Sequence, residues 1–143
     1  MIITKKPAKK KPTRNKTSLK NSLDKVFSQF IRLRDTPGGV GRCISCQKLI
    51  TYSDSDCGHY INRKHMTTRY DEKNCNAQCR SCNRFDEGNL QGYRRGLLIK
   101  IGEKETDLLE VKKHDTSTMG LFELEILIIH YKKKVKELSG KSC

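Results

Sequence analysis

The chain has 143 residues, which is the size of one domain and too short for a multi-domain enzyme with its own cofactor domain. Its hydrophobic content of 34% lies below the roughly 45–50% of an average globular chain, so the core must be modest and something else should stabilise it. The formal net charge of +14 disfavours acidic or neutral small-molecule chemistry and favours a polyanionic partner, with nucleic acid ahead of an anionic membrane surface.

Residues 1–17 form a basic arm. Residues 1–20 together hold eight basic residues, no acidic residue and two prolines. Such a segment cannot bury enough apolar surface to offset the entropy of ordering it. We expect residues 1–17 to be disordered and to lie along phosphates; the alternative is an arm that serves only solubility.

A helix is predicted from Ser18 to about Arg34, because apolar residues recur there at helical spacing. Either Ser18 or Ser22 is a candidate for its N-cap. Pro37 and three nearby glycines then break the helix. The apolar positions are Leu19, Leu23, Val26, Phe27 and Phe30.

The region 42–93 is rich in Cys, Asn, Asp and Gly and poor in long periodic runs, which predicts loops, short strands and one helix around a metal ion. It contains two Cys-x-x-Cys knuckles, Cys43/Cys46 and Cys79/Cys82, and each can place two thiolates on one tetrahedral zinc ion. Four thiolates leave no open coordination position. This zinc is therefore expected to be structural and to compensate for the weak core.

The remaining cysteines are interpreted from the expected compartment. No apolar run approaches the roughly 20 residues of a membrane span, and the basic start lacks the apolar region of a signal peptide. We therefore expect a cytoplasmic protein that contacts no membrane, with metal-bound or free thiols rather than disulfides. Cys57 and Cys75 could form a second zinc site with His59 and His65, although their spacing matches no knuckle.

The region 94–143 is expected to be helical. One helical face continues from Leu90 to Ile101, and a short helix is predicted over residues 103–113. A last helix, from about residue 121 to 138, carries two apolar stripes where a surface helix needs one. The second stripe predicts a homodimer interface, unless both stripes are buried within one chain. The stripes are Leu121, Leu124, Ile128, Tyr131, Val135 and Leu138, and Phe122, Ile126 and Ile129.

Between and around the knuckles the chain resembles the zinc-braced HNH nucleases, also called ββα-metal nucleases, over about residues 42–93. The shared pattern is a knuckle, then His59, then Asn74, then the second knuckle followed directly by Asn83. A closer resemblance is to the NinG/Rap family of lambdoid phages, recombination nucleases that act on branched DNA. The stretches that carry it are residues 58–60, 69–74, 77–84, 88–89 and 93–97.

Phosphodiester hydrolysis needs an activated water, charge stabilisation and help for the leaving oxygen. A neutral imidazole can take a proton from water near pH 7, so we expect His59 to be the general base. Asn83 offers a carbonyl oxygen suited to Mg²⁺ or Mn²⁺, the expected catalytic ion. The resemblance implies that Asn74 supports catalysis by hydrogen-bonding the loop that aims His59.

The chain departs from many HNH enzymes at one position. Those enzymes have an Asp directly before the catalytic His, as a second metal ligand, whereas this chain has Gly58. Asp56 is the nearest carboxylate and the tentative replacement. Asp86 and Glu87 follow Asn83 by three and four residues, so on a helix they would share its face, and Asp86 is the other tentative ligand.

The sequence thus predicts an α+β fold, in which residues 18–143 form one nuclease domain with a small zinc-braced ββα-metal core flanked by N- and C-terminal helices. The predicted function is a metal-dependent endonuclease on branched DNA that resolves Holliday junctions in phage or prophage recombination, inside the bacterial host. Two alternatives stay open: a non-catalytic zinc-stabilised DNA-binding module, and an HNH nicking nuclease on plain duplex DNA. The expected DNA-contacting residues are Arg63, Arg84, Arg94 and Arg95.

Overall fold

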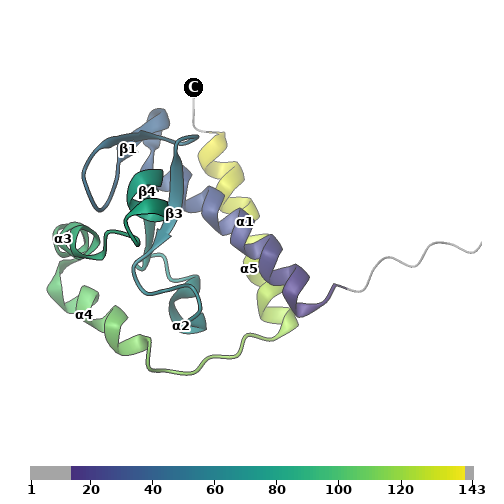
Figure 1. Ribbon diagram of the computed structural model, residues 1–143. Helices are drawn as coiled ribbons and strands as arrows, with labels where there is room; N and C mark the ends of the chain where they lie inside the picture. Colours follow the sequence, from purple (N-terminus) through teal and green to yellow (C-terminus); the bar gives the residue numbers. More distant parts are fainter. Residues whose placement is uncertain (1–13, 141–143) are drawn as a thin grey trace, which may run out of the picture.

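The computed structural model describes residues 14–140 and has a mixed α+β architecture (Figure 1). Helices α1 and α5 lie side by side on one side of the molecule, α3 and α4 lie on the other, and the short strands lie between them. In chain order the helices are α1 (Lys16–Asp35), α2 (Met66–Arg69), α3 (Leu90–Lys100), α4 (Gly102–Lys112) and α5 (Leu121–Ser139). The strands are β1 (Val40–Arg42), β2 (Leu49–Thr51), β3 (Ser55–His59) and β4 (Cys75–Cys79).

Helix α1 begins two residues before the predicted start. Asn15, rather than Ser18 or Ser22, is its N-cap: the Asn15 side chain accepts a hydrogen bond of 2.8 Å from the backbone N–H of Ser18. The helix therefore includes Lys16 and Thr17, which the sequence had placed in the basic arm. Residues 1–13 of that arm lie outside the described residues.

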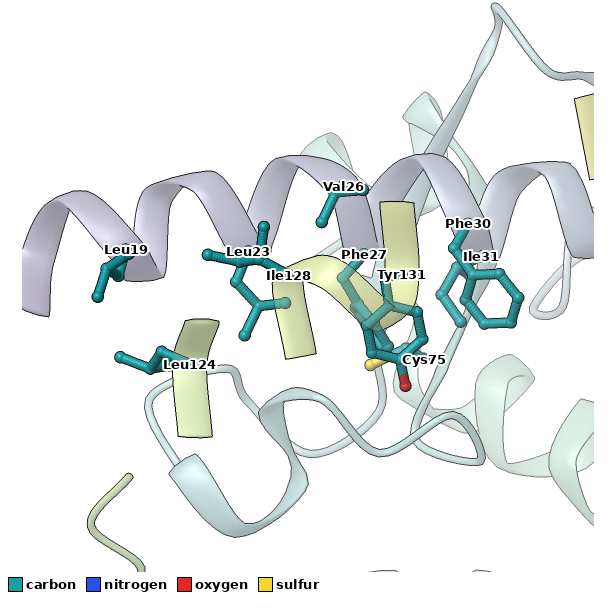
Figure 2. Close-up of a cluster of buried hydrophobic side chains, with 10 residues drawn as sticks. All are labelled: Leu19, Leu23, Val26, Phe27, Phe30, Ile31, Cys75, Leu124, Ile128 and Tyr131. Carbon is teal, nitrogen blue, oxygen red and sulfur yellow. The ribbon is translucent and has the colours of Figure 1, made fainter. Parts of the chain in front are cut away.

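The main core lies between α1 and α5 (Figure 2). The two helices run in the same direction, so Leu124 lies near Leu19, and Tyr131 lies near Phe27. The predicted apolar face of α1 is fully confirmed, because all five of its residues are buried. The buried set is Leu19, Leu23, Val26, Phe27, Phe30, Ile31, Cys75, Leu124, Ile128 and Tyr131.

The two stripes of α5 have different surroundings. Leu124, Ile128 and Tyr131 of the first stripe face α1, but Leu121 is half exposed. The second stripe is exposed: Phe122 has 73% and Ile129 has 69% of its surface accessible. Within residues 14–140, no helix has both the length and the hydropathy needed to cross a membrane.

Two antiparallel hairpins form the β structure. Strand β1 pairs with β2, and β3 pairs with β4 in a register that places Ser55 opposite Cys79 and His59 opposite Cys75. The segment between β3 and β4 contains α2. The second hairpin thereby brings together residues that lie up to 24 positions apart in sequence, Ser55 and Cys79 among them.

The chain turns directly after β4 through a π-helix, η2 (Ser81–Phe85). Asn83 lies in the middle of this turn, and the turn ends at Phe85. The prediction that Asn83 and Asp86 share a helix face is therefore wrong, because Asp86 has already left the helical conformation (φ −125°). Helices α3 and α4 follow, and Gly102, the first residue of α4, adopts the left-handed conformation (φ 83°).

Candidate functional site

The four knuckle cysteines come together. Cys43 and Cys46 lie on the turn between β1 and β2, Cys79 ends β4, and Cys82 lies on the π-helix. Their sulfur atoms all lie within 4.8 Å of one another, and only Cys46 is exposed. The cluster joins the turn of the first hairpin to the end of the second.

The donor set of this cluster fits zinc. The Cys46 and Cys79 sulfurs are 3.8 Å apart. Two sulfurs bound to one tetrahedral zinc at about 2.3 Å have the same separation. The Cys82 backbone N–H donates to Cys79 Sγ (3.4 Å), and Asn89 Nδ2 donates to Cys82 Sγ (3.3 Å). Such donors stabilise thiolates, so Cys43, Cys46, Cys79 and Cys82 could hold a metal such as zinc.

His59 ends β3 and faces a cavity of about 400 Å³. Asn83 from the π-helix lines the same cavity, and so do Arg63 and Glu87. The fold therefore brings together the two residues predicted to carry the chemistry, although they are 24 positions apart in sequence. The complete lining is Cys57, His59, Tyr60, Asn62, Arg63, Asn83, Glu87, Gly88 and Leu90.

The His59 ring is held in one orientation. Its Nε2 lies 3.0 Å from the backbone carbonyl oxygen of Arg69. Because a carbonyl only accepts hydrogen bonds, Nε2 carries the proton and Nδ1 has the free lone pair. Burial is the largest influence on the pKa of His59 and lowers it below its ordinary value of 6.5, and the positive charges of Arg63 and Arg69 act in the same direction. The ring is therefore neutral at pH 7.

Asn74 is fully buried and fixes the loop that carries Arg69. Its Oδ1 accepts from the backbone N–H of Ile61 (2.7 Å), and its Nδ2 donates to the backbone oxygens of Ile61 and Thr68 (both 3.1 Å). These bonds tie the start of the β3–β4 connection to α2, whose last residue supplies the carbonyl that orients His59. Asn74 thus holds the loop whose carbonyl contacts His59; its supporting role in catalysis stays a prediction.

Asn83 also faces a second cavity of about 430 Å³, which contains Asp56. Asn83 Nδ2 donates to Asp56 Oδ2 (3.0 Å), so the carbonyl oxygen of the Asn83 side chain has no role in this bond. Arg84 binds the same Asp56 carboxylate through two contacts of 2.8 Å. Burial acts to raise the pKa of Asp56, but the bonds from Arg84 and Asn83 outweigh it and leave the pKa below its ordinary value.

The remaining residues predicted for the site, Asp86, Arg94 and Arg95, lie outside the His59 cavity. Asp86 is exposed and does not line the His59 cavity, whereas Glu87 does. Arg94 is paired with Asp107 (2.8 Å) and Glu110 (3.1 Å). Arg95 is exposed on α3.

The sequence offered a second zinc site of Cys57, Cys75, His59 and His65, and the fold brings three of these residues together. The ligand atoms of Cys57, Cys75 and His59 lie within 4.8 Å of one another, but His65 is not part of this group. The β3–β4 register places His59 opposite Cys75, which no cysteine motif indicates.

Sequence reasoning missed the buried side chain of Gln78, which packs over Gly58 and which no local pattern indicates.

Comparisons with known proteins agree with the resemblance. A family model described as "Bacteriophage Lambda NinG protein" matches residues 4–141. The chain is 33% identical over 114 residues to a protein of Escherichia phage lambda named "Protein ninG", 34% over 114 residues to the protein of that name in Escherichia phage 933W, and 35% over 116 residues to that in Salmonella phage P22.

These matches cover 79% of this chain but only 53–54% of the relatives, so the chain spans about half the length of the curated proteins it matches. The comparison with solved structures gives no match.

Proposed function

Because this chain belongs to the NinG family of phage proteins, we propose that it is a metal-dependent DNA endonuclease with a zinc-braced ββα-metal (HNH) core that cuts branched DNA, including Holliday junctions. The observation that carries the proposal is the meeting of His59 and Asn83 in one cavity. His59 lies on hairpin β3–β4, and Asn83 lies on the helical turn that follows the hairpin. Two strands followed by a helical turn is the order of elements in a ββα-metal core.

In this proposal His59 is the general base. Its Nε2–H is donated to the Arg69 carbonyl, so Nδ1 can accept a proton from water. The water oxygen bonds to the phosphorus while its proton passes to Nδ1, and the phosphorus–oxygen bond to the leaving oxygen breaks. Asn74 is a positioning residue in this step, because it holds the loop whose carbonyl fixes the His59 ring.

Asn83 is the proposed ligand of the catalytic ion. Its amide nitrogen is bound to Asp56, which leaves the amide oxygen, a hard donor of the kind that Mg²⁺ and Mn²⁺ prefer. When bound, such an ion would neutralise charge on the scissile phosphate and on the leaving oxygen. Asp56 orients Asn83 in this arrangement. To bind the ion itself, the Asp56 carboxylate would have to break its ion pair with Arg84. Glu87, which lines the cavity, is a better placed carboxylate than Asp86.

The DNA is proposed to approach over the rim of the His59 cavity. Arg63 lines that cavity, and Lys64 lines an adjoining one that shares Tyr60 and Asn62 with it. The net charge of +14 favours the phosphate backbone as the main contact, and binding by shape suits a branched substrate. Arg84 and Arg94 already have acidic partners, so Arg63 is the strongest candidate of the four predicted arginines.

A homodimer would suit this substrate. A four-way junction has near two-fold symmetry, and a C₂ dimer presents two identical sites in that arrangement. Each chain has one His59–Asn83 cavity. The exposed stripe of Phe122, Ile126 and Ile129 on α5 is the proposed contact surface between the two copies.

Two observations favour a second candidate function, a non-catalytic zinc-stabilised DNA-binding module. The position of the expected Asp is taken by Gly58, and the Asp56 carboxylate is paired with Arg84. If Glu87 does not bind an ion, the cavity lacks a carboxylate ligand. DNA binding without cleavage would then be the function.

The deciding experiment incubates purified protein with a four-way junction and with a linear duplex of matched sequence, in Mg²⁺, Mn²⁺ or EDTA. We expect the metals to support cleavage of the junction and EDTA to abolish it. His59→Ala should abolish cleavage and keep binding, whereas His114→Ala, an exposed histidine that lines neither the His59 cavity nor the proposed dimer stripe, is the control that should cut normally. Binding without cleavage in every metal would favour the second candidate, and equal cleavage of both substrates would favour a nicking nuclease on plain duplex.

A further inference from the structure

The face of hairpin β3–β4 that turns toward α1 carries a group of metal-ligating side chains outside the knuckles. Alternate residues of a strand share a face, so Cys57 and His59 point to the same side of β3. Cys75 lies directly opposite His59 on β4. The two thiols and a ring nitrogen of His59 lie within 4.8 Å of one another.

We propose that Cys57, Cys75 and His59 form a second zinc site, and that zinc bound there prevents His59 from acting as the base. Two thiolates and one imidazole are the ligands that zinc favours over Mg²⁺. Three protein ligands leave one position open, so this site should bind zinc more weakly than the closed four-thiolate cluster.

The surroundings allow an ion to enter. Cys75 is completely buried, but Cys57 is partly exposed and lines the His59 cavity as well as a smaller one of about 110 Å³. This smaller cavity lies between the hairpin and α1, where Phe27 and Ser28 form part of its wall. An ion can therefore reach the thiols from solvent, and a water molecule can complete its coordination.

The inhibitory effect rests on the proposed function. It is expected whether zinc binds Nδ1 or Nε2 of His59. Zinc on Nδ1 would occupy the lone pair that has to accept the proton. Zinc on Nε2 would displace the hydrogen bond to the Arg69 carbonyl, and the neutral ring would then carry its proton on Nδ1. In both cases His59 no longer has a free acceptor for the proton of water.

The test counts metal ions and needs no DNA. Full-length protein is purified under reducing conditions, equilibrated with buffered free Zn²⁺ and assayed for zinc per chain. The wild type should reach two zinc ions, and Cys57→Ser and Cys75→Ser should each reach one. Ser28→Ala, which changes the same cavity without removing a ligand, is the matched control and should reach two.

Co²⁺ added to protein that holds only its structural zinc gives a second readout, the ultraviolet thiolate-to-cobalt absorption band. We expect the band in the wild type and in Ser28→Ala, and its loss in Cys57→Ser. Retention of one zinc and of the wild-type circular dichroism spectrum would show that Cys57→Ser is folded. A wild type that never exceeds one zinc, or a second zinc that persists in folded Cys57→Ser, would overturn the site.

The inhibitory effect is measured on junction cleavage in excess Mg²⁺, as the Zn²⁺ concentration that halves each protein's own rate. Cys57→Ser should raise that concentration on the order of 10-fold or more. An unchanged value would overturn the inhibitory role. If the protein can bind two zinc ions but cuts no DNA in Mg²⁺ or Mn²⁺ even when it holds only its structural zinc, the site stands, while the proposed nuclease function and the inhibitory role both fail.

Discussion

The side-chain oxygen of Gln78 occupies the space that a Cβ atom at Gly58 would need. Gln78 is held there rigidly, because its Nε2 donates to Ser45 Oγ (2.8 Å) and to the Gly88 carbonyl oxygen (2.6 Å). The two residues lie on neighbouring positions of the same hairpin face, since Gln78 pairs with Asp56. The departure from the HNH pattern at position 58 thus has a steric cause.

This packing predicts that an Asp cannot simply be restored at position 58. Gly58→Asp should destabilise the protein by roughly 1–3 kcal/mol, the usual cost of forcing extra atoms into a packed site. Urea unfolding measures the effect. Gly140→Ala, where a Cβ would make only an ordinary contact at 3.4 Å, is the control and should stay close to wild type. A Gly58→Asp variant as stable as the wild type would show that Gln78 moves away freely.

The four-thiolate cluster should make stability depend on zinc. It links the β1–β2 turn to β4 and the π-helix, and the smaller core around it has few other apolar residues, among them Ile50 and Ala77. Removing zinc with a strong chelator, or replacing Cys79 by Ser, should lower the thermal midpoint by on the order of 10 °C or more. Elemental analysis and calorimetry check this together. Bound zinc that can be removed without any change in the midpoint would contradict a structural role.

A buried ion pair predicts how stability depends on pH. Asp35 accepts from Arg34 Nε (2.7 Å), Lys100 Nζ (3.2 Å) and the backbone N–H of Ala77 (2.8 Å). Burial acts to raise the pKa of Asp35, but these partners outweigh it and bring the pKa below its ordinary value of 3.8. Because the folded-state pKa is lower than the unfolded one, the contribution to stability is complete above about pH 5 and is lost as the pH falls through 3.8 toward the folded value.

Asp35→Asn should therefore remove on the order of 1–3 kcal/mol at neutral pH and flatten the acid branch of the stability curve. Urea unfolding from pH 7 to pH 3 gives the curve. Asp54→Asn removes an exposed carboxylate and controls for the change in net charge. Acid branches of equal slope in the wild type and Asp35→Asn would assign the acid sensitivity to other titratable groups of the protein.

The helices were predictable from the sequence because their signal is local. The apolar spacing that begins at Leu19 and the stripe that contains Leu124 gave α1 and α5 to within about two residues. The strands were not located individually, because strands of three to five residues depend on partners far along the chain. The pairing of His59 with Cys75 is an example: nothing near either residue indicates it.

In the candidate site, too, local patterns were predictable from the sequence and contacts between distant residues were not. The spacing of a knuckle is a local pattern, so Cys43 and Cys46 were identified from sequence. The turn that contains Cys82 and Asn83 is a π-helix that ends at Phe85, and its geometry depends on tertiary contacts. The sequence therefore placed both Asp86 and Glu87 on the face of Asn83, whereas in the fold only Glu87 lines the cavity with Asn83. The arginine pairs also depend on tertiary structure, because Arg94 is paired with residues of α4.

The arginine pairs lead to a prediction for DNA binding. Arg63 lines the His59 cavity, and Arg94 is held by Asp107 and Glu110. Arg63→Ala should weaken binding and reduce the slope of log K against log salt by about 0.9, the value for one lost phosphate contact on duplex DNA. Arg94→Ala is the matched control, with a smaller change expected. Fluorescence anisotropy over a range of salt concentrations measures the affinity and the slope for both variants. Equal slopes for the wild type and Arg63→Ala would show that Arg63 makes no phosphate contact.

Neighbouring residues on α5 provide a test of the proposed homodimer. Ile128 is 3% exposed in the core against α1, and Ile129 is 69% exposed on the opposite stripe. Ile129→Lys should therefore convert a dimer to a monomer with little loss of stability, whereas Ile128→Lys should unfold the α1–α5 pair, because it buries an unpaired charge. Light scattering at micromolar concentration and circular dichroism separate the two effects. If the wild type is a monomer that cuts a junction symmetrically in one binding event, the exposed stripe is not the dimer contact, and a single chain must then reach both strands in turn.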